Sequence, residues 1–299
     1  MKQKQQATPQ DQAKDEFPSY AKATTNPDSN VLKDKCAKVL GSIWDMSSDE
    51  FLFNLSSIID YSRTLPLTKR SVLKLSSKIF NPLGLLVPFT VKMKILLQEL
   101  CSETSSWDDP LSIDLKAEWK SVLTELILLN DVRIRRCYFQ SSGEPSSIQL
   151  HGSSNASKAA YAAVLYLRSV CENGHVEVRL VASKGRVAPV KKQSIPRLEL
   201  LGATVLVRLV DTVLQCRQSK FKEIKCFNCT DSMAVLCWVT SNKSWKQYVL
   251  HRVQEIQRLT SMESWRFCPG QMNPADLPSR GVKASELVKS HSWWNGPTF

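Results

Sequence analysis

The sequence predicts an α/β protein in which a mixed five-stranded sheet is flanked by helices and preceded by a smaller region of one hairpin and several helices. First, 299 residues with 42% apolar and 23% charged side chains are typical of a globular protein with room for about two domains. Second, amphipathic helical patterns fill the first half of the chain. Third, three β-like segments in the second half are followed by helices alternating with strands, which predicts a mixed sheet.

The first half begins with residues 1–30, which nearly lack large apolar groups and are expected to be a disordered tail. A β-like run at 36–45 and an alternating segment at 49–55 predict a hairpin. Helical periodicity follows in three segments, which are interrupted by Asn-Pro and Asp-Pro turns. These segments are 68–80, 88–101 and 115–129.

The second half begins with three expected strands, at 147–155, 161–167 and 176–183, and Asn173-Gly174 predicts a hairpin turn between the last two. The segments that follow alternate between helix and strand. They are a helix at 194–216, a strand at 224–230, helices at 231–238 and 245–259, a strand at 265–268 and a final turn leading to 273–277.

Charge and cysteine usage indicate the kind of partner and the compartment. Forty basic against 28 acidic residues give a net charge of +12 and favour a polyanionic partner, nucleic acid before membrane. Nine scattered cysteines fit a reducing compartment, and Cys226 and Cys229 are interpreted as strand residues rather than zinc ligands. No signal peptide opens the chain, and the apolar stretch 83–91 is too short to span a bilayer. We therefore expect an intracellular protein, cytoplasmic or nuclear, that is not secreted.

The helix expected at 194–216 is apolar on nearly every face and is therefore expected in the interior of the protein. Glu199 is the acidic residue near its start and is unusual in such a position. Ser194 is a plausible N-cap, and Pro196 is tolerated in a first turn. A buried carboxylate costs several kcal/mol unless cations or donors meet it. Glu199 either complements the helix dipole or binds a metal, and the second interpretation requires other acids nearby.

Three further polar residues stand at the ends of expected elements. Asp231 follows a strand and could simply cap the next helix, Asp276 could be a first-turn residue, and Asn155 could belong to an Asx turn. Each ordinary explanation suffices alone. All four positions nevertheless lie at element ends that can sit side by side, at the edge where open α/β sheets place their ligand sites.

A cluster of basic residues immediately precedes the Glu199 helix, with no acid between its first and last members. It is either a solvated loop or a surface that follows phosphates. Its position beside the acidic residues favours the phosphate-binding surface, because a site that acts on nucleic acid must hold a polyanion next to its carboxylates. The candidate nucleic-acid-binding residues are Lys184, Arg186, Lys191, Lys192 and Arg197.

From about Lys38 to Phe299 the chain resembles the polyprotein of BEL/Pao-type LTR retrotransposons, in the region often labelled a Pao peptidase. The resemblance covers the last part of the reverse transcriptase and the ribonuclease H domain. Five motifs carry it, in order along the chain. They are Val39–Trp44, Lys78–Leu86, Lys94–Leu100, Ser194–Gly202 and Asn273–Gly281.

The resemblance implies a ribonuclease H-like fold preceded by a reverse transcriptase thumb/connection remnant. The implied organisation is a disordered tail at 1–30, a thumb/connection-like helical subdomain at 31–140, a ribonuclease H-like domain at 145–281 and a C-terminal tail at 282–299 leading toward a missing integrase. No Tyr-x-Asp-Asp signature is present, so no polymerase activity is expected, and no Asp-Thr/Ser-Gly motif supports a protease. The chain is similar to a fragment of a decayed or host-captured element.

The resemblance also implies a site. Four carboxylates in such folds hold two Mg²⁺ or Mn²⁺ ions for phosphodiester hydrolysis, and they map onto Asn155, Glu199, Asp231 and Asp276. The first of these is an amide here, in Ser154–Ser157 where the family has Ser-Asp-Ala-Ser. We therefore expect a protein that binds RNA–DNA hybrid or duplex nucleic acid, with a weakened two-ion site at Glu199, Asp231 and Asp276 and impaired cleavage. The alternative is a non-catalytic binding or scaffolding module whose carboxylates only cap helices.

Overall fold

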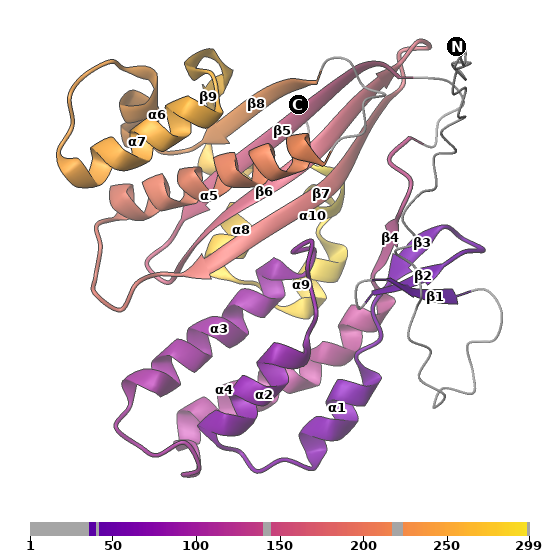
Figure 1. The fold of residues 1–299 in the computed structure, drawn as a ribbon. Helices are drawn as coiled ribbons and strands as arrows, with labels where there is room; N and C mark the ends of the chain where they lie inside the picture. The colour runs from indigo at the N-terminus through magenta and orange to yellow at the C-terminus, as the bar shows by residue number, and fades with distance from the viewer. Residues whose placement is uncertain (1–35, 40–41, 140–144, 217–223, 298–299) are drawn as a thin grey trace, which may run out of the picture.

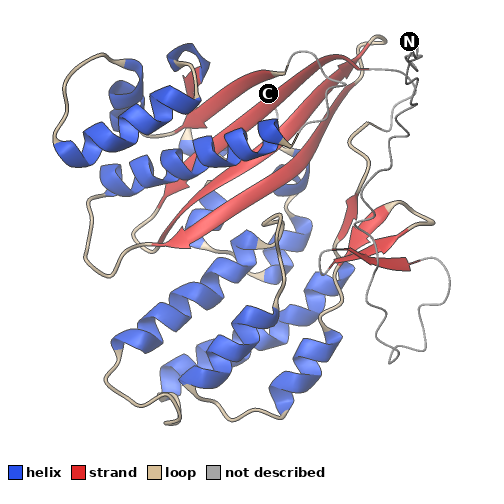
Figure 2. Ribbon diagram, in the orientation of Figure 1, coloured by secondary structure: helices blue, strands red, loops and turns tan. Residues whose placement is uncertain are grey.

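A computed structural model describes residues 36–39, 42–139, 145–216 and 224–297 (Figure 1). The tail expected at 1–30 lies outside the described residues. Within them, a long twisted sheet lies between two layers of helices, and a small second sheet stands beside the lower helical layer (Figures 1 and 2).

The long sheet has five strands in the order β7-β6-β5-β8-β9, so the predicted mixed sheet is confirmed. The first three strands form an antiparallel meander, whereas β8 runs parallel to β5 and β9 runs parallel to β8. Gly174 in the predicted turn has φ +79°, a left-handed conformation that glycine adopts without strain. The strands are β5 (Pro145–Ala156), β6 (Ala160–Cys171), β7 (Val176–Val187), β8 (Lys225–Thr230) and β9 (Trp265–Phe267).

The upper helical layer packs on one face of this sheet and comprises α5, α6 and α7 (Figure 2). The apolar side chains of α5 explain this placement, because Leu198, Leu206 and Val210 are almost completely buried against the strands. Cys226 and Cys229 lie in β8, as expected for strand residues. The helices are α5 (Ile195–Gln215), α6 (Met233–Thr240) and α7 (Gln247–Leu259), and the single turn η2 (Met262–Ser264) precedes β9.

The other face of the sheet packs against α3 and two short C-terminal helices, α8 and α10, whereas a third, α9, packs on η1 and α3. Val164, Tyr166 and Leu180 from the sheet share one core with the N-terminal helices, so the two halves of the chain are built around a common interior. The C-terminal elements are η3 (Gly270–Met272), α8 (Asp276–Arg280), α9 (Ala284–Lys289) and α10 (His291–Asn295).

The three helices expected in the first half are present, with boundaries shifted by a few residues. They are α2 (Lys69–Lys78), α3 (Val87–Ser102) and α4 (Ile113–Glu125), which continues into η1 (Leu126–Asp131). Helix α1 (Ser56–Arg63) was not expected from the sequence, because its apolar residues form no extended helical stripe.

The expected N-terminal hairpin is part of a four-stranded antiparallel sheet, β1-β2-β3-β4. The segment expected as one strand forms two, which pair with each other, and β3 pairs with the second. The fourth strand has three residues from much later in the chain, too few for a sequence pattern. The strands are β1 (Cys36–Val39), β2 (Ser42–Asp45), β3 (Glu50–Leu52) and β4 (Arg133–Arg135).

The stretch 282–299, expected as a C-terminal tail, is ordered in its described part and contains α9 and α10. Ala284, Leu287 and Trp293 are fully buried. The Trp293 indole Nε1 donates to the Leu85 carbonyl at 3.0 Å, and the Tyr166 hydroxyl donates to the Trp293 carbonyl at 2.9 Å. These contacts make the stretch part of the shared core.

Candidate active site

The four candidate residues come together at one end of the long sheet. Asn155 is the penultimate residue of β5, and the parallel register pairs Ser154 with Thr230, so Asp231 follows β8 beside Asn155. Glu199 comes from the first turns of α5, on one face of the sheet. Asp276 is the first residue of α8, on the other face. The carboxyl ends of two parallel strands are the usual location for a ligand site in such a sheet.

Asn155 bonds directly to Asp276. Its side-chain Nδ2 donates to Asp276 Oδ1 at 2.9 Å, and its Oδ1 accepts from the Ala156 backbone N–H at 2.6 Å. The Arg280 Nε donates to the same Asp276 oxygen at 2.7 Å, one helical turn along α8. Asp276 is therefore a residue of the first turn of α8, as one of the two interpretations of the sequence predicts. Its carboxylate also accepts hydrogen bonds from Asn155 of β5 and from the Arg280 guanidinium.

Asp231 does not cap α6, so its ordinary explanation fails. The N-cap is Ser232, whose hydroxyl accepts from the Val235 backbone N–H at 3.3 Å. Asp231 Oδ1 is buried and has no hydrogen-bond partner among the described residues. The carboxylate at this position is thus left with an open oxygen inside the protein.

Burial and mutual repulsion raise the pKa of two of the carboxyl groups. Burial is the main cause that raises the pKa of Glu199; the nearby Asp231 charge adds to it, and a hydrogen bond with Ser232 partly offsets it. Burial also raises the pKa of Asp231, and the Asp276 charge adds to it, while donors from its own backbone and Asn273 and the Arg280 charge act in the opposite direction. These interactions place Glu199 close to Asp231 and Asp231 close to Asp276.

Two supporting residues were not among the sequence candidates. Asn273 is buried and pins the loop before α8 to the end of β5, because its Nδ2 donates to the Ser154 carbonyl at 3.0 Å and its Oδ1 accepts from the Ala275 N–H at 3.0 Å. Arg280 is the second. Both flank Asp276 inside the Asn273–Gly281 motif, which is the signal that could have identified them.

The carboxylate oxygens at the strand ends are suitable ligands for a hard divalent cation, but they do not form a complete coordination site. Carboxylate oxygens are the ligands Mg²⁺ prefers, and Asp231 offers a buried oxygen without a partner. Yet among the described residues no three His, Cys, Asp or Glu side chains converge closely enough to hold a metal ion. Asp276 is instead met by the Asn155 amide and by Arg280.

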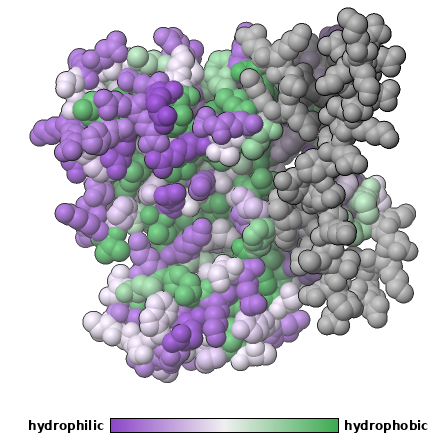
Figure 3. All heavy atoms as spheres, viewed as in Figure 1, coloured by the Kyte–Doolittle hydropathy of each residue, from purple (hydrophilic) through white to green (hydrophobic). Residues whose placement is uncertain are grey.

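The five basic candidates are all exposed and border this end of the sheet. Asn155 of β5 pairs with Ala162 of β6, which pairs with Gly185 of the edge strand β7. The backbone of Gly185 therefore lies two strand spacings, about 10 Å, from that of Asn155. Lys184 and Arg186 are the neighbours of Gly185 along β7. Lys191 and Lys192 lie in the loop before α5. In the space-filling view, hydrophilic side chains gather over the α5 and α7 layer (Figure 3).

Arg197, the fifth basic candidate, belongs to a stacked group that joins α5 to α7. Its guanidinium lies 4.8 Å from the ring centroid of Tyr248, and the Arg252 guanidinium lies 3.7 Å from the same ring. Arg252 also donates to the Tyr248 carbonyl at 2.8 Å. Such cation–π contacts fix the direction of Arg197 two residues before Glu199.

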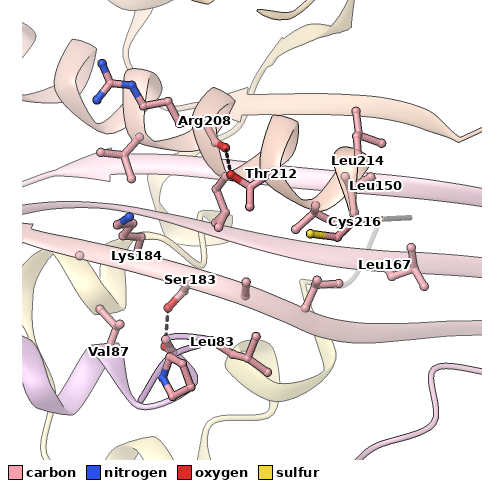
Figure 4. A pocket seen from close by; sticks show the side chains of 18 of the residues that line it. Leu83, Val87, Leu150, Leu167, Ser183, Lys184, Arg208, Thr212, Leu214 and Cys216 are labelled. Carbon is pink, nitrogen blue, oxygen red and sulfur yellow. Dashed lines mark hydrogen bonds between the residues drawn. The ribbon is translucent and has the colours of Figure 1, made fainter. Parts of the chain in front are cut away.

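A cleft of about 870 Å³ opens elsewhere, between α5, the edge strand β7 and the loop before α3 (Figure 4). Lys184 and Arg208 reach its rim, and the Arg208 guanidinium pairs with Glu255 of α7. Its walls are largely apolar, and none of the four candidate residues at the strand ends lines it. The cleft is therefore separate from the carboxylates.

His151, in β5, is packed rather than placed for proton transfer. It stacks on Phe227 with ring centroids 5.0 Å apart, and its Nε2 lies 2.9 Å from Gln149 Oε1. Burial lowers its pKa to about 4, with the Arg168 charge adding to the effect. The imidazole is therefore neutral at pH 7.

A family model described as "Pao retrotransposon-like RNaseH-like domain" matches residues 68–232, more than half of the chain. The matched range contains Asn155, Glu199 and Asp231, and Asp276 lies beyond it. No curated protein matches the chain.

Solved structures with similar folds include viral, archaeal and environmental proteins. The foamy viral protease-reverse transcriptase in complex with RNA/DNA hybrid is 11% identical, with a TM-score of 0.45 over 79% of this chain, which spans only 29% of that protein. RNase H1 from the halophilic archaeon Halobacterium salinarum NRC-1 is 12% identical, with a TM-score of 0.28 over 44% of this chain and 91% of that chain. LC11-RNase H1 in complex with RNA/DNA hybrid, isolated from compost, is 12% identical, with a TM-score of 0.27 over the same shares.

Within the described residues, no helix is long and apolar enough to cross a membrane.

Proposed function

The chain belongs to the Pao retrotransposon-like RNaseH-like family, and from this premise we propose that it binds RNA–DNA hybrid or duplex nucleic acid with impaired phosphodiester cleavage. The observation that supports this most strongly is the hydrogen bond from Asn155 to Asp276. An amide thus stands at the strand end where the resemblance implies a carboxylate. The organisation into a thumb/connection-like region before residue 140 and a ribonuclease H-like domain at 145–281 is part of the same proposal.

Glu199 and Asp231 are the residues that would hold a divalent cation, because they are close to each other and Asp231 keeps an open buried oxygen. When bound, such an ion supplies a polarised water and stabilises negative charge on phosphate oxygens. The protein's own part is to hold these carboxylates in place. Ser232 caps the helix that follows Asp231, and Asn273 pins the loop before α8 to the end of β5.

Asn155 weakens this site because it removes one negative charge and presents an N–H to Asp276. The family fold generally works with divalent ions, and neutralisation by those ions supplies several kcal/mol of transition-state stabilisation. A missing carboxylate therefore lowers the rate by orders of magnitude while leaving the basic surface intact.

The basic residues beside the strand ends supply the contacts to the nucleic acid. Lys191 and Lys192 are exposed in the loop that leads to Glu199, and Arg197 is held by Tyr248 at the start of the same helix. A hybrid duplex is recognised by its shape, phosphates and 2′-hydroxyls, which suits a surface of cations without base-reading side chains in a groove.

A non-catalytic binding or scaffolding module is the second candidate. It is favoured by the absence, among the described residues, of three acidic or metal-ligating side chains that could hold an ion together. Thermal unfolding with and without Mg²⁺ separates the two. An ion-induced rise in Tm that disappears in Glu199→Gln/Asp231→Asn supports the ribonuclease H-like site, and no rise supports the module.

Binding is tested by fluorescence anisotropy of a short labelled RNA–DNA hybrid over a series of salt concentrations. Replacing Lys191 and Lys192 by Gln removes two phosphate contacts, so the slope of log affinity against log salt should fall by about two. Replacing Lys116 and Lys120 by Gln is the control, because both are exposed on α4 in the N-terminal helical region. Unchanged binding in the first variant, or no binding by the wild-type chain, would contradict the proposal.

A further inference from the structure

The cleft between α5 and β7 exists because α5 covers only part of the long sheet. The helix packs mainly on β5 and β6, so the α5 side of the edge strand β7 is left open. The loop before α3 closes the cleft from below, where the Leu83 carbonyl accepts the Ser183 backbone N–H at 2.8 Å. The volume of about 870 Å³ lies within the range of roughly 300–1,000 Å³ that is typical of small-molecule sites.

The polar side chains in the walls of this cleft already have partners. The Thr212 hydroxyl donates to the Arg208 carbonyl at 2.8 Å, one helical turn earlier, and the Ser183 hydroxyl donates to the Gly84 carbonyl (Figure 4). These groups present mainly carbon to a ligand. Much of the remaining wall is aliphatic and includes Leu150, Leu167, Val205 and Leu209. A ligand of this cleft must therefore be largely apolar.

The charges on the cleft all have one sign. Four basic side chains line it, and none of the described residues that line it is acidic. Arg208 is paired with Glu255 of α7. Lys94, Lys184 and Arg186 form no ion pair with another described residue. Such unpaired cations around a cleft attract anions.

Strand geometry directs two of these cations to the α5 side of the sheet. A Cβ on Gly185 would lie 2.6 Å from Val87 Cγ1, so Gly185 faces α3. Successive residues of a strand face opposite sides, so Lys184 and Arg186 both point toward the α5 side, where the cleft lies. Both side chains are exposed and can therefore reach a ligand.

The two ends of the cleft differ in character. Lys184 and Arg208 lie at one end, and Leu167 and Leu214 lie toward the other (Figure 4). At this second end α5 terminates at Gln215 without a basic residue in its last turn, so no side chain of that turn offsets the negative end of the helix dipole. An anionic group is therefore favoured beside Lys184 and an apolar group at the opposite end.

We propose that this cleft binds a small amphipathic anion that consists of one aliphatic chain and one carboxylate. The carboxylate lies at Lys184 and Arg186, and the chain follows α5 and β6 toward Leu167 and Leu214. The size of the cleft and its closure by the loop before α3 suit a free molecule rather than a lipid within a bilayer. The inference goes beyond the proposed function and requires no nucleic acid.

The experiment displaces a fluorescent fatty-acid analogue, 11-(dansylamino)undecanoate, from the full chain below the critical micelle concentration of each competitor. Dodecanoate should displace it. Octanoate should compete about tenfold more weakly or less, because fewer methylene groups are buried. Dodecyltrimethylammonium, which has the same chain length and the opposite charge, should not displace the analogue.

Two variants test the position of the ligand. Thr212→Glu places a negative charge on the cleft wall and should weaken dodecanoate binding by about fivefold. Thr124→Glu is the matched control and should change nothing, because Thr124 is an exposed helical threonine of α4 whose hydroxyl also donates one turn back, to the Lys120 carbonyl at 2.9 Å. Lys184→Gln/Arg186→Gln should weaken binding by about tenfold, since each exposed ion pair changes an equilibrium constant by about fivefold at most.

Three results would overturn the inference: no displacement by dodecanoate, equal displacement by dodecyltrimethylammonium, or equal effects of Thr212→Glu and Thr124→Glu. Binding to phosphatidylserine vesicles without binding to free dodecanoate would also overturn it, because the ligand would then be a membrane surface. Cooperative thermal unfolding verifies that each variant is folded. If Thr212→Glu does not fold, unchanged dodecanoate affinity in Lys184→Gln/Arg186→Gln is the result that contradicts the proposed position.

Discussion

At the scale of single residues, the site is a balance between buried carboxylates and the few donors that meet them. Glu199 and Asp231 both have a raised pKa because burial and neighbouring negative charge oppose ionisation. Asp276 is instead met by Asn155 and Arg280. The same end of the sheet thus contains one carboxylate that accepts hydrogen bonds from two donors and two carboxyl groups whose ionisation is opposed by burial.

The raised pKa values have a direct consequence for stability. The unfolded chain ionises these carboxyl groups at their ordinary pKa, whereas the folded chain holds its protons to higher pH. Stability is therefore lost as pH rises through the interval between the unfolded and the raised folded pKa, and it stays lower above it.

Asp231→Asn should consequently raise Tm at pH 7 in the presence of a chelator, by a few degrees, the shift that about 1 kcal/mol produces in a chain of this size. The gain should vanish at pH 3, where the native carboxyl is protonated. Thermal unfolding at both pH values measures it. Asp108→Asn is the control with the opposite sign, because the hydrogen bond from Arg70 lowers the pKa of Asp108. A lower Tm for Asp231→Asn at pH 7 would contradict this electrostatic explanation.

At the scale of elements, the loop before α3 connects the N-terminal helices to the edge of the long sheet. Ser183 of β7 donates its backbone N–H to the Leu83 carbonyl at 2.8 Å, and its hydroxyl donates to the Gly84 carbonyl. A Cβ on Gly84 would lie 1.8 Å from the Ser183 carbonyl oxygen, and Gly84 has φ +73°. The glycine therefore permits a backbone contact that no other residue can make.

Gly84→Ala should cost about 3 kcal/mol or more, because the loop must leave β7 as well as adopt a strained left-handed conformation. Gly174→Ala is the matched control, since it has φ +79° with nothing within 4 Å of its Cβ position, and it should cost only about 1–2 kcal/mol. Urea unfolding measures both free energies. Equal losses would mean that the contact with Ser183 contributes nothing.

The elements that the sequence could predict are those with a repeated pattern. The strands β5, β6 and β7 have twelve residues each, with a long buried apolar run in β6, and α5 carries an apolar surface over five turns. Strand β4 and the helices α9 and α10 have three to six residues each, and their pairing or burial depends on partners far away in the chain. Long-range packing rather than local propensity determines them, so no local signal was available.

The candidate site follows the same division. That Asn155, Asp231 and Asp276 lie together could be predicted, because strand ends and helix starts meet at one edge of such a sheet. The direction of the Asn155 amide and the pairing of Arg280 could not, because they depend on a five-residue helix that the sequence shows only as a turn.

At the scale of the whole molecule, the two halves share one interior, and the long sheet carries chemistry at one end. Core side chains from the N-terminal helices, the sheet and the C-terminal helices form a single cluster, and the upper helices form the other. Hence the strand ends that hold Asn155 and Asp231 are fixed from both faces. A net charge of +12 favours association of the chain with polyanions, and we propose that the basic residues beside Glu199 direct it toward this edge.

We propose that Asn155 alone impairs an otherwise intact ribonuclease H-like site. The most direct test is cleavage of a labelled RNA–DNA hybrid in Mg²⁺ and in Mn²⁺ by the wild-type chain, by Asn155→Asp and by Asn155→Asp/Asp231→Asn. We expect cleavage by Asn155→Asp only, because the fourth carboxylate restores the charge that the ions require and the double variant removes it again. Equal cleavage by the wild-type chain and Asn155→Asp would show that an amide suffices at this position and would contradict the claim.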